Sequence, residues 1–134
     1  MGEKIRLLIV DDHEGVRREL VAMLRRSPDL EVVGATGDAE EAVRWVAEQR
    51  PDVVLIDVKR DDGCGVELCR RLTHNGHEPV VVVLTSYLGR QEWEEARKAG
   101  AQGYLLKQID SKALVVKIRE MAREHASRGR ADGR

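Results

Sequence analysis

Short apolar runs alternate along the chain with longer segments in which apolar residues recur every three or four positions. The short runs are rich in Val, Ile and Leu, and they cover residues 5–10, 30–36, 53–57, 80–85 and 103–106. Runs that are apolar at nearly every position are typical of strands buried on both faces of a parallel sheet. The pattern therefore predicts five parallel strands.

The segments that follow these runs carry the spacing of amphipathic helices. Five strand–helix pairs joined by right-handed crossovers predict an α/β fold, with a doubly wound five-stranded parallel sheet in three α/β/α layers. Alternation alone leaves the strand order open. The five apolar stripes are Val16, Leu20, Met23 and Leu24; Ala39, Ala42, Val43, Val46 and Ala47; Val66, Leu68, Cys69 and Leu72; Trp93, Ala96 and Ala99; and Leu114, Ile118, Met121 and Ala122.

The length of 134 residues suits one compact domain. From Ser127 the sequence reads SRGRADGR, which is polar and has no periodicity. We therefore expect a folded domain over residues 1–126 and a disordered tail or the start of a linker over residues 127–134.

Composition narrows the setting and the partners. The net charge of −1 provides no basic field, so direct binding of nucleic acid by this chain is not expected. No apolar run approaches the ~18–20 residues of a membrane span, and the N-terminus reads as a strand rather than a signal peptide. Cys64 and Cys69 fit neither a redox pair nor a zinc site. We expect a soluble cytoplasmic protein with reduced cysteines and no membrane contact.

Polar residues stand where four of the five predicted strands end. Asp11 and Asp12 follow the first strand, Asp57 ends the third, Thr85 ends the fourth and Lys107 follows the fifth. In an open parallel sheet, ligands bind beyond the carboxyl ends of the strands. We therefore expect three carboxylates, a hydroxyl and an ammonium to meet at one edge of the sheet.

Such a group favours phosphoryl chemistry. Clustered carboxylates repel one another and need a cation, and Mg²⁺ prefers oxygen ligands of this kind. An aspartate can act as a nucleophile and form an aspartyl phosphate, with positive charge supplied by Mg²⁺ and Lys107. Taken singly, Asp11 or Asp12 is an ordinary helix cap and Lys107 an ordinary surface lysine. Their combination at the few strand ends favours the functional interpretation.

Five stretches of the chain carry recognisable motifs: LLIVDDH at 7–13, VVLIDV at 53–58, DGCGVELCRRL at 62–72, VVVLTS at 81–86 and GAQGYLLK at 100–107. Together they resemble the receiver domains of bacterial two-component response regulators over residues 4–125. The wording is nearest to the LuxR/NarL-type subfamily, whose members carry a C-terminal helix-turn-helix. The resemblance implies a flavodoxin-like fold with strand order 2-1-3-4-5 and a receiver domain over residues 1–126.

The resemblance also implies a phosphoacceptor and a metal site. Asp57 would accept a phosphoryl group from a partner histidine kinase, and the protein would be a signalling phosphoacceptor rather than an enzyme. Asp12 would bind Mg²⁺ directly and Asp11 mainly through water. Asp57 and the backbone carbonyl of Lys59 would be the other protein ligands.

A conformational switch follows from the same resemblance. Thr85 and Lys107 match the family's switch hydroxyl and phosphate-pairing lysine, and phosphate on Asp57 would draw both inward. Tyr104 matches the aromatic switch position and would move from exposed to buried. From the residue alone, Tyr104 is equally a half-buried strand residue with its hydroxyl in water.

The implied output is regulation of transcription through a separate or missing DNA-binding domain. A homodimer would form through the fourth helix, fifth strand and fifth helix, or through the first and fifth helices, and the sequence leaves both faces open.

The loop after Asp57 departs from the family pattern. Members usually carry an apolar residue at position 60 and proline at 61, where this chain has Arg60 and Asp61. Loss of proline is expected to loosen the loop. Lys59 is hypothesised to reach Glu14 or the phosphate and to change the lifetime of the phosphate. Position 108 is Gln rather than Pro, so a cis bond before it, which would cost ~2.5–4 kcal/mol, is not expected.

Two other functions compete with the phosphoreceiver. A Mg²⁺-dependent phosphatase would use Asp57 as its nucleophile, but it needs a carboxylate two positions later, where this chain has Lys59, and no insertion is long enough for a substrate cap. A single-domain or degenerate receiver that acts only as a protein-interaction module is the other alternative, and the altered loop keeps it open.

Overall fold

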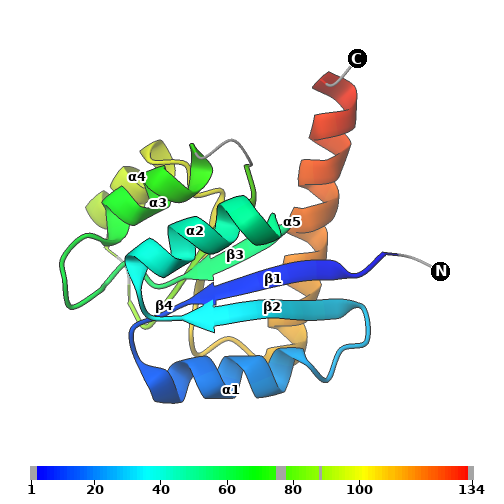
Figure 1. Ribbon diagram of the computed structural model, residues 1–134, viewed down its shortest axis with the longest axis horizontal. Coiled ribbons are helices and arrows are strands. Elements are labelled where there is room, and N and C mark those ends of the chain that lie inside the picture. The colour runs from blue at the N-terminus through cyan, green and yellow to red at the C-terminus, as the bar shows by residue number, and fades with distance from the viewer. Residues whose placement is uncertain (1–2, 75–77, 88, 133–134) are drawn as a thin grey trace.

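Within the residues that the computed structural model describes, five strands and five helices alternate strictly along the chain (Figure 1). The structure describes residues 3–74, 78–87 and 89–132, with side chains as far as residue 126. The elements are β1 (Ile5–Val10), α1 (Glu14–Leu24), β2 (Leu30–Thr36), α2 (Ala39–Gln49), β3 (Val53–Ile56), α3 (Gly65–Thr73), β4 (Val80–Thr85), α4 (Arg90–Lys98), β5 (Gly103–Leu106) and α5 (Ser111–Asp132).

The strands form one parallel sheet in the order β2-β1-β3-β4-β5. This confirms the doubly wound α/β fold predicted from the apolar runs and the strand order implied by the resemblance. The third strand ends at Ile56, one residue earlier than predicted, so Asp57 is the first residue beyond β3. That position lies at the carboxyl edge of the sheet, where the loops leave the strands.

Side chains of the buried strands alternate between two separate hydrophobic cores. Along β1, Leu8 and Val10 belong to one core, whereas Leu7 and Ile9 belong to the other. Successive side chains of a strand point to opposite faces, so a strand that is apolar throughout serves both cores. The continuous apolar runs of the sequence therefore follow from burial on both faces.

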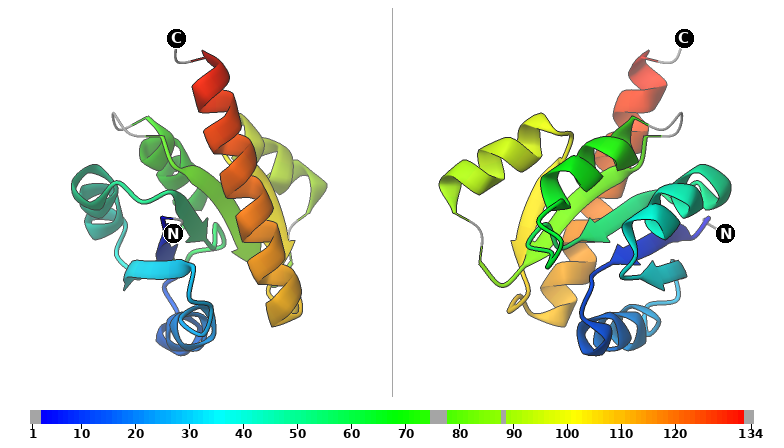
Figure 2. Two further views of the ribbon diagram at one scale, coloured as in Figure 1. Left: turned by 90° about the vertical axis from the view of Figure 1, so that its right-hand side faces the viewer. Right: turned by 60° about the vertical axis from the view of Figure 1, so that its left-hand side comes forward.

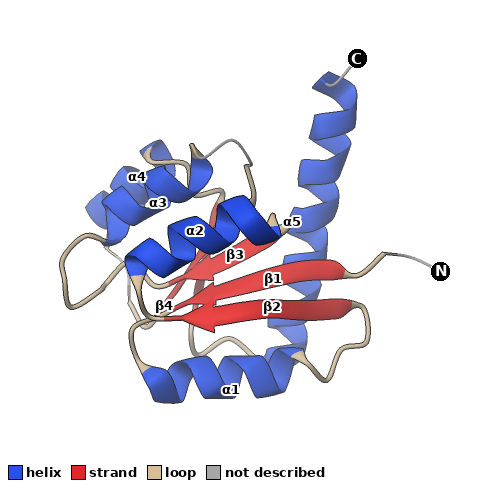
Figure 3. Cartoon of the chain, in the orientation of Figure 1, coloured by secondary structure: helices blue, strands red, loops and turns tan. Residues whose placement is uncertain are grey.

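Helices cover both faces of the sheet (Figure 3). The first core takes its helical residues from α2, α3 and α4, including Val46 and Leu72, and the second takes Leu24 from α1 and Ile118 from α5. Figure 2 shows α5 running along one face of the sheet in the left-hand view. The three α/β/α layers are thus as predicted.

A forked ion pair connects α5 to the loop between α1 and β2. Arg119 Nε lies 2.7 Å from Asp29 Oδ2, and Arg119 Nη2 lies 2.8 Å from Asp29 Oδ1. The hydrogen bond from Arg119 lowers the pKa of Asp29 below its ordinary value. The backbone of α5 continues as helix to Asp132, past Ala126, after which the sequence predicts a disordered tail or the start of a linker. Figure 1 shows the C-terminal part of α5 extending beyond the sheet.

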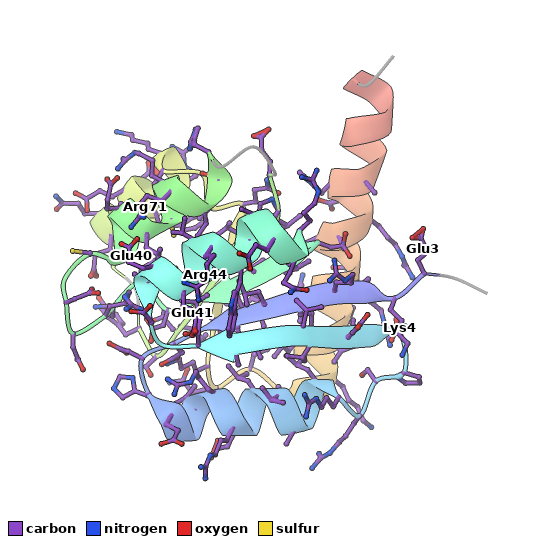
Figure 4. The ribbon with its side chains drawn as sticks, viewed as in Figure 1. Glu3, Lys4, Glu40, Glu41, Arg44 and Arg71 are labelled. Atoms are coloured by element: carbon purple, nitrogen blue, oxygen red, sulfur yellow. The ribbon has the colours of Figure 1, made fainter. Side chains whose placement is uncertain are left out.

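Ion pairs between exposed side chains also connect neighbouring helices. Glu40 of α2 and Arg71 of α3 point toward each other in Figure 4, with Arg71 Nη1 2.7 Å from Glu40 Oε2. Among the helices of the described ranges, none combines the length and the apolar character that crossing a bilayer requires.

Candidate functional site

The carboxylates after β1 and β3 lie side by side because hydrogen bonds continue beyond the strand ends. The Asp57 amide donates to the Val10 carbonyl at 3.1 Å, and the Asp11 amide donates to the Thr36 carbonyl at 3.0 Å. Asp11 and Asp57 are only 2% and 5% exposed. Two aspartates at neighbouring strand ends are therefore held almost out of water, where an unpaired charge is costly.

The ammonium of Lys107 lies between these two buried carboxylates. Its Nζ atom is 2.7 Å from Asp57 Oδ2 and 2.8 Å from Asp11 Oδ2. The Lys107 amide donates to the Thr85 carbonyl at 2.8 Å, which fixes where the side chain begins. Burial alone would lower the pKa of Lys107, but hydrogen bonds to Asp11 and Asp57 outweigh it, so its pKa is raised. Lys107 therefore stays charged and joins the first, third and fifth strand ends.

Asp12 completes the acidic group and has one oxygen to spare. Its Oδ2 accepts a hydrogen bond from the Asp61 amide at 2.8 Å. Its Oδ1 is buried and accepts no hydrogen bond within the described part of the chain, although His13 Nδ1 lies 3.2 Å away. Ligand atoms of Asp11, Asp12 and His13 lie within 4.8 Å of one another. Because a buried carboxylate oxygen is normally paired, this one is suited to a cation.

His13 was not among the site residues predicted from the sequence. Its Nδ1 lies 3.2 Å from Asp11 Oδ1, and its amide donates to the same oxygen at 2.9 Å. The available signal was its position directly after the acidic pair. Asp57 lies outside this group of three and is connected to it through Lys107.

Lys59 follows Asp57 by two positions, and its side chain contacts a different loop. The Lys59 amide donates to Asp57 Oδ1 at 2.8 Å. Its Nζ lies 3.2 Å from Glu92 Oε2 and 5.2 Å from the centre of the Tyr87 ring. Glu14, the acceptor hypothesised from the sequence, instead pairs with Arg18. Lys59 thus bridges the β3–α3 loop to the β4–α4 loop and the start of α4.

The two predicted switch residues lie at the β4–β5 side of the site. Thr85 is buried, and its hydroxyl donates to the Tyr87 carbonyl at 3.4 Å rather than to a carboxylate. Tyr104 is 38% exposed, with its ring 5.3 Å from that of Trp93. The structure therefore places Thr85 beside Lys107 through the backbone, and it leaves Tyr104 in a partly exposed position.

The loop between β3 and α3, which the missing proline is expected to loosen, carries several side-chain hydrogen bonds. The Arg60 side chain donates from Nη2 to the Gly37 carbonyl at 2.7 Å and from Nε to both oxygens of Asp62 at 3.2–3.3 Å. Asp62 Oδ1 also accepts from the Cys64 amide at 2.9 Å, next to the start of α3. The Lys107–Gln108 bond on the other side of the site is trans.

The motifs and the geometry both have counterparts among known proteins. The family model of the response regulator receiver domain matches residues 7–119 of the chain. The chain belongs to this family. The receiver is 40% identical over 117 residues to the DNA-binding transcriptional activator DevR/DosR of Mycobacterium tuberculosis, covering 87% of this chain and 54% of that protein. It is 37% identical over 115 residues to the transcriptional regulatory protein LiaR of Bacillus subtilis, covering 86% of this chain and 54% of that one.

Solved receiver structures have the same fold. The signal receiver domain of the response regulator NarL from Mycobacterium tuberculosis superposes with a TM-score of 0.84 at 25% identity, covering 91% of this chain and 98% of that one. A LuxR-family response regulator from Aurantimonas gives a TM-score of 0.81 at 30% identity, covering 91% and 87%. The receiver is thus of the LuxR/NarL type, as the motifs indicated, and it spans about half the length (54%) of the curated relatives DevR/DosR and LiaR.

Proposed function

We propose that this receiver accepts a phosphoryl group on Asp57 from a histidine kinase, in a Mg²⁺-dependent reaction. The single observation that carries the proposal is the position of Lys107, whose ammonium contacts Asp57 Oδ2 and Asp11 Oδ2 at 2.7 and 2.8 Å. An ammonium held against the acceptor neutralises charge where phosphoryl oxygens arrive, and phosphoryl transfer depends mainly on positioning and charge neutralisation.

In the proposed step the bond between phosphorus and the kinase imidazole nitrogen breaks as a bond forms from Asp57 to phosphorus. The imidazole leaves with the electron pair. The ammonium of Lys107 then donates a hydrogen bond to one phosphoryl oxygen. The hydroxyl of Thr85, which lies 3.4 Å from the Tyr87 carbonyl in this structure, rotates to donate to a second phosphoryl oxygen. The turn of Thr85 would release space behind it for Tyr104.

Mg²⁺ would be held by Asp12, Asp57 and the backbone carbonyl of Lys59, with Asp11 binding mainly through water. When bound, the ion neutralises the acidic group and fixes an oxygen of the incoming phosphoryl group. The residues fit it because the buried Oδ1 of Asp12 has no hydrogen-bond partner in the described ranges.

Phosphorylation of the isolated chain tests the proposal. Incubation with acetyl phosphate and Mg²⁺ is expected to add the mass of one phosphoryl group, in an acid-stable and base-labile linkage. Asp57→Asn removes the nucleophilic carboxylate and should abolish the adduct, as should EDTA. Intact-protein mass spectrometry measures both effects.

The matched control is Glu67→Gln, which removes an exposed carboxylate on α3 that pairs with Arg70 and does not belong to the acidic group. It should still be phosphorylated. Release of phosphate without accumulation would instead indicate a phosphatase. Neither adduct nor turnover would indicate a receiver that acts only as an interaction module.

Lys59 is proposed to lengthen the life of the phosphorylated state. Its side chain pairs with Glu92 at 3.2 Å and so lies across the loops that border Asp57. Lys59→Ala is expected to speed loss of the phosphoryl group a few-fold, in keeping with an exposed ion pair worth up to about 1 kcal/mol. Decay of the adduct followed by mass spectrometry measures this. An unchanged decay rate relative to Lys98→Ala, on the far end of α4, would reject the role.

The cellular role follows from the relatives. Regulation of transcription is proposed because DevR/DosR and LiaR are transcriptional regulators and share this receiver. The DNA-binding part would lie outside this chain, and a cytoplasmic location is proposed on the same grounds. Pairing of two receivers through α4, β5 and α5, or through α1 and α5, stays a prediction.

A further inference from the structure

The side chain of Arg60 is buried although it belongs to a loop. Only 5% of it is exposed. Its Nη2 donates to the Gly37 carbonyl in the β2–α2 loop at 2.7 Å, and its Nε and Nη2 reach the Asp62 carboxylate at 3.2–3.3 Å. One guanidinium therefore joins two loops at the carboxyl edge of the sheet. Arginine suits this because its planar group offers donors in a fixed fork.

This burial has a cost that calls for a reason. The Nη1 atom of Arg60 is buried and donates no hydrogen bond within the described ranges. A buried polar nitrogen without a partner is destabilising, and a buried guanidinium more so. An apolar side chain would fill this position without that penalty.

Both of the loops that Arg60 joins contact Asp12. A Cβ atom on Gly37 would lie 3.0 Å from the Asp12 Cα, so the β2–α2 loop is already in close contact with the Asp12 backbone. On the other side, the residue after Arg60 donates its amide to Asp12 Oδ2 at 2.8 Å. That amide is available because position 61 is not proline. Both loops thus restrict Asp12. Its Oδ1, which accepts no hydrogen bond in the described ranges and lies 3.2 Å from His13 Nδ1, is fixed with it.

We propose that Arg60 is a positioning residue for Asp12: by joining the β2–α2 and β3–α3 loops, it keeps the Asp61 amide on Oδ2 and so leaves Oδ1 available to a cation. The inference rests on the proposed Mg²⁺ site. Partners of this kind, which orient a metal ligand without touching the metal, typically change metal affinity by 10–100-fold when removed.

The charge of Arg60 would act in the opposite direction. A cation near the site opposes Mg²⁺, so removing it should strengthen metal binding if only its field mattered. Removing the connection that Arg60 makes between the two loops should weaken metal binding. The sign of the change in affinity therefore distinguishes a positioning role from a simple electrostatic one.

The experiment measures Mg²⁺ binding to the whole chain by isothermal titration calorimetry. Arg60→Leu is expected to weaken Mg²⁺ binding by about tenfold. Arg60→Lys keeps the charge but loses the fork, so it should also weaken binding, by less. Arg97→Leu is the matched control, because Arg97 is exposed and pairs only with Glu94 of its own helix in the described structure. It should bind Mg²⁺ as the wild type does.

A second readout needs no metal. In metal-free protein, Arg60→Leu should speed hydrogen exchange at the Asp61 amide by about tenfold, because that amide loses its fixed acceptor. An unchanged exchange rate, or Mg²⁺ affinity equal to or tighter than wild type in Arg60→Leu, would overturn the proposal. If Arg60→Leu does not fold, the same two measurements on Arg60→Lys decide it. Failure of the wild type to bind Mg²⁺ would reject the proposed function. The exchange rates of the Asp61 amide would still test whether Arg60 holds the two loops together.

Discussion

Replacing Gly65 with alanine is expected to lower the free energy of unfolding by about 3 kcal/mol or more. Gly65 begins α3, and a Cβ atom there would lie 1.8 Å from the carbonyl oxygen of Val58 and 2.4 Å from its carbon. The obstruction is backbone rather than the flexible end of a side chain, so relief requires moving either α3 or the residue after Asp57. Urea unfolding followed by circular dichroism measures the loss.

Gly15→Ala is the control for this substitution. Gly15 lies in α1, and a Cβ atom added there meets nothing within 4 Å. Alanine is favoured over glycine inside a helix, so this variant should gain about 0.5–1 kcal/mol. If both variants unfold at the same urea concentration as the wild type, the close approach between α3 and Val58 is not a constraint on the fold.

Removing Lys107 is the other change with a large expected effect. Its side chain is 17% exposed and contacts two carboxylates that are almost fully buried. In Lys107→Met those carboxylates share a site without a cation, and the free energy of unfolding should fall by about 2–3 kcal/mol at pH 7 in EDTA, a value reduced for partial exposure. Adding Mg²⁺ should recover part of the loss, because an ion that binds only the folded state stabilises it.

The pH dependence of this effect has a definite sign. The pKa of Lys107 is raised in the folded state above its ordinary value of 10.5. The stability contributed by Lys107 is therefore fully present below pH 10.5 and is lost as the pH rises through the folded pKa.

Lys117→Met, at an exposed pair with Glu120, should cost under about 0.5 kcal/mol. Equal stability of Lys107→Met and Lys117→Met at pH 7 would contradict this account.

The sheet and the core of the site were predictable because they depend on strand ends. Burial on both faces makes each strand a continuous apolar run, and the residue after such a run must lie at the carboxyl edge. Asp11, Asp57 and Lys107 were placed together by that reasoning, and the structure joins them through one ammonium. Their contact also depends on the strand order, which the alternation of elements leaves open and the family resemblance supplied.

Contacts made by long side chains in the loops were beyond the sequence pattern. Lys59 was expected to reach Glu14 or the phosphate, and in the structure it contacts Glu92. Arg60 reaches across to Gly37. Which partner such a side chain selects depends on rotamers and on how two loops pack, and neither has a periodicity along the chain. The loop that the missing proline is expected to loosen thus carries hydrogen bonds from Arg60, which no local sequence motif predicts.

Side chains alternate along β5, so this strand contacts the hydrophobic cores on both faces of the sheet. Tyr104 contacts Trp93, which packs on the core of α2, α3 and α4, whereas the next residue, Leu105, packs on the core of α1 and α5. Neighbouring side chains of one strand move in opposite senses when the strand rotates about its own axis. We therefore expect that a rotation drawing Tyr104 inward on one side would move Leu105 outward on the other, so that a change on the α4 side would reach the core beneath α5.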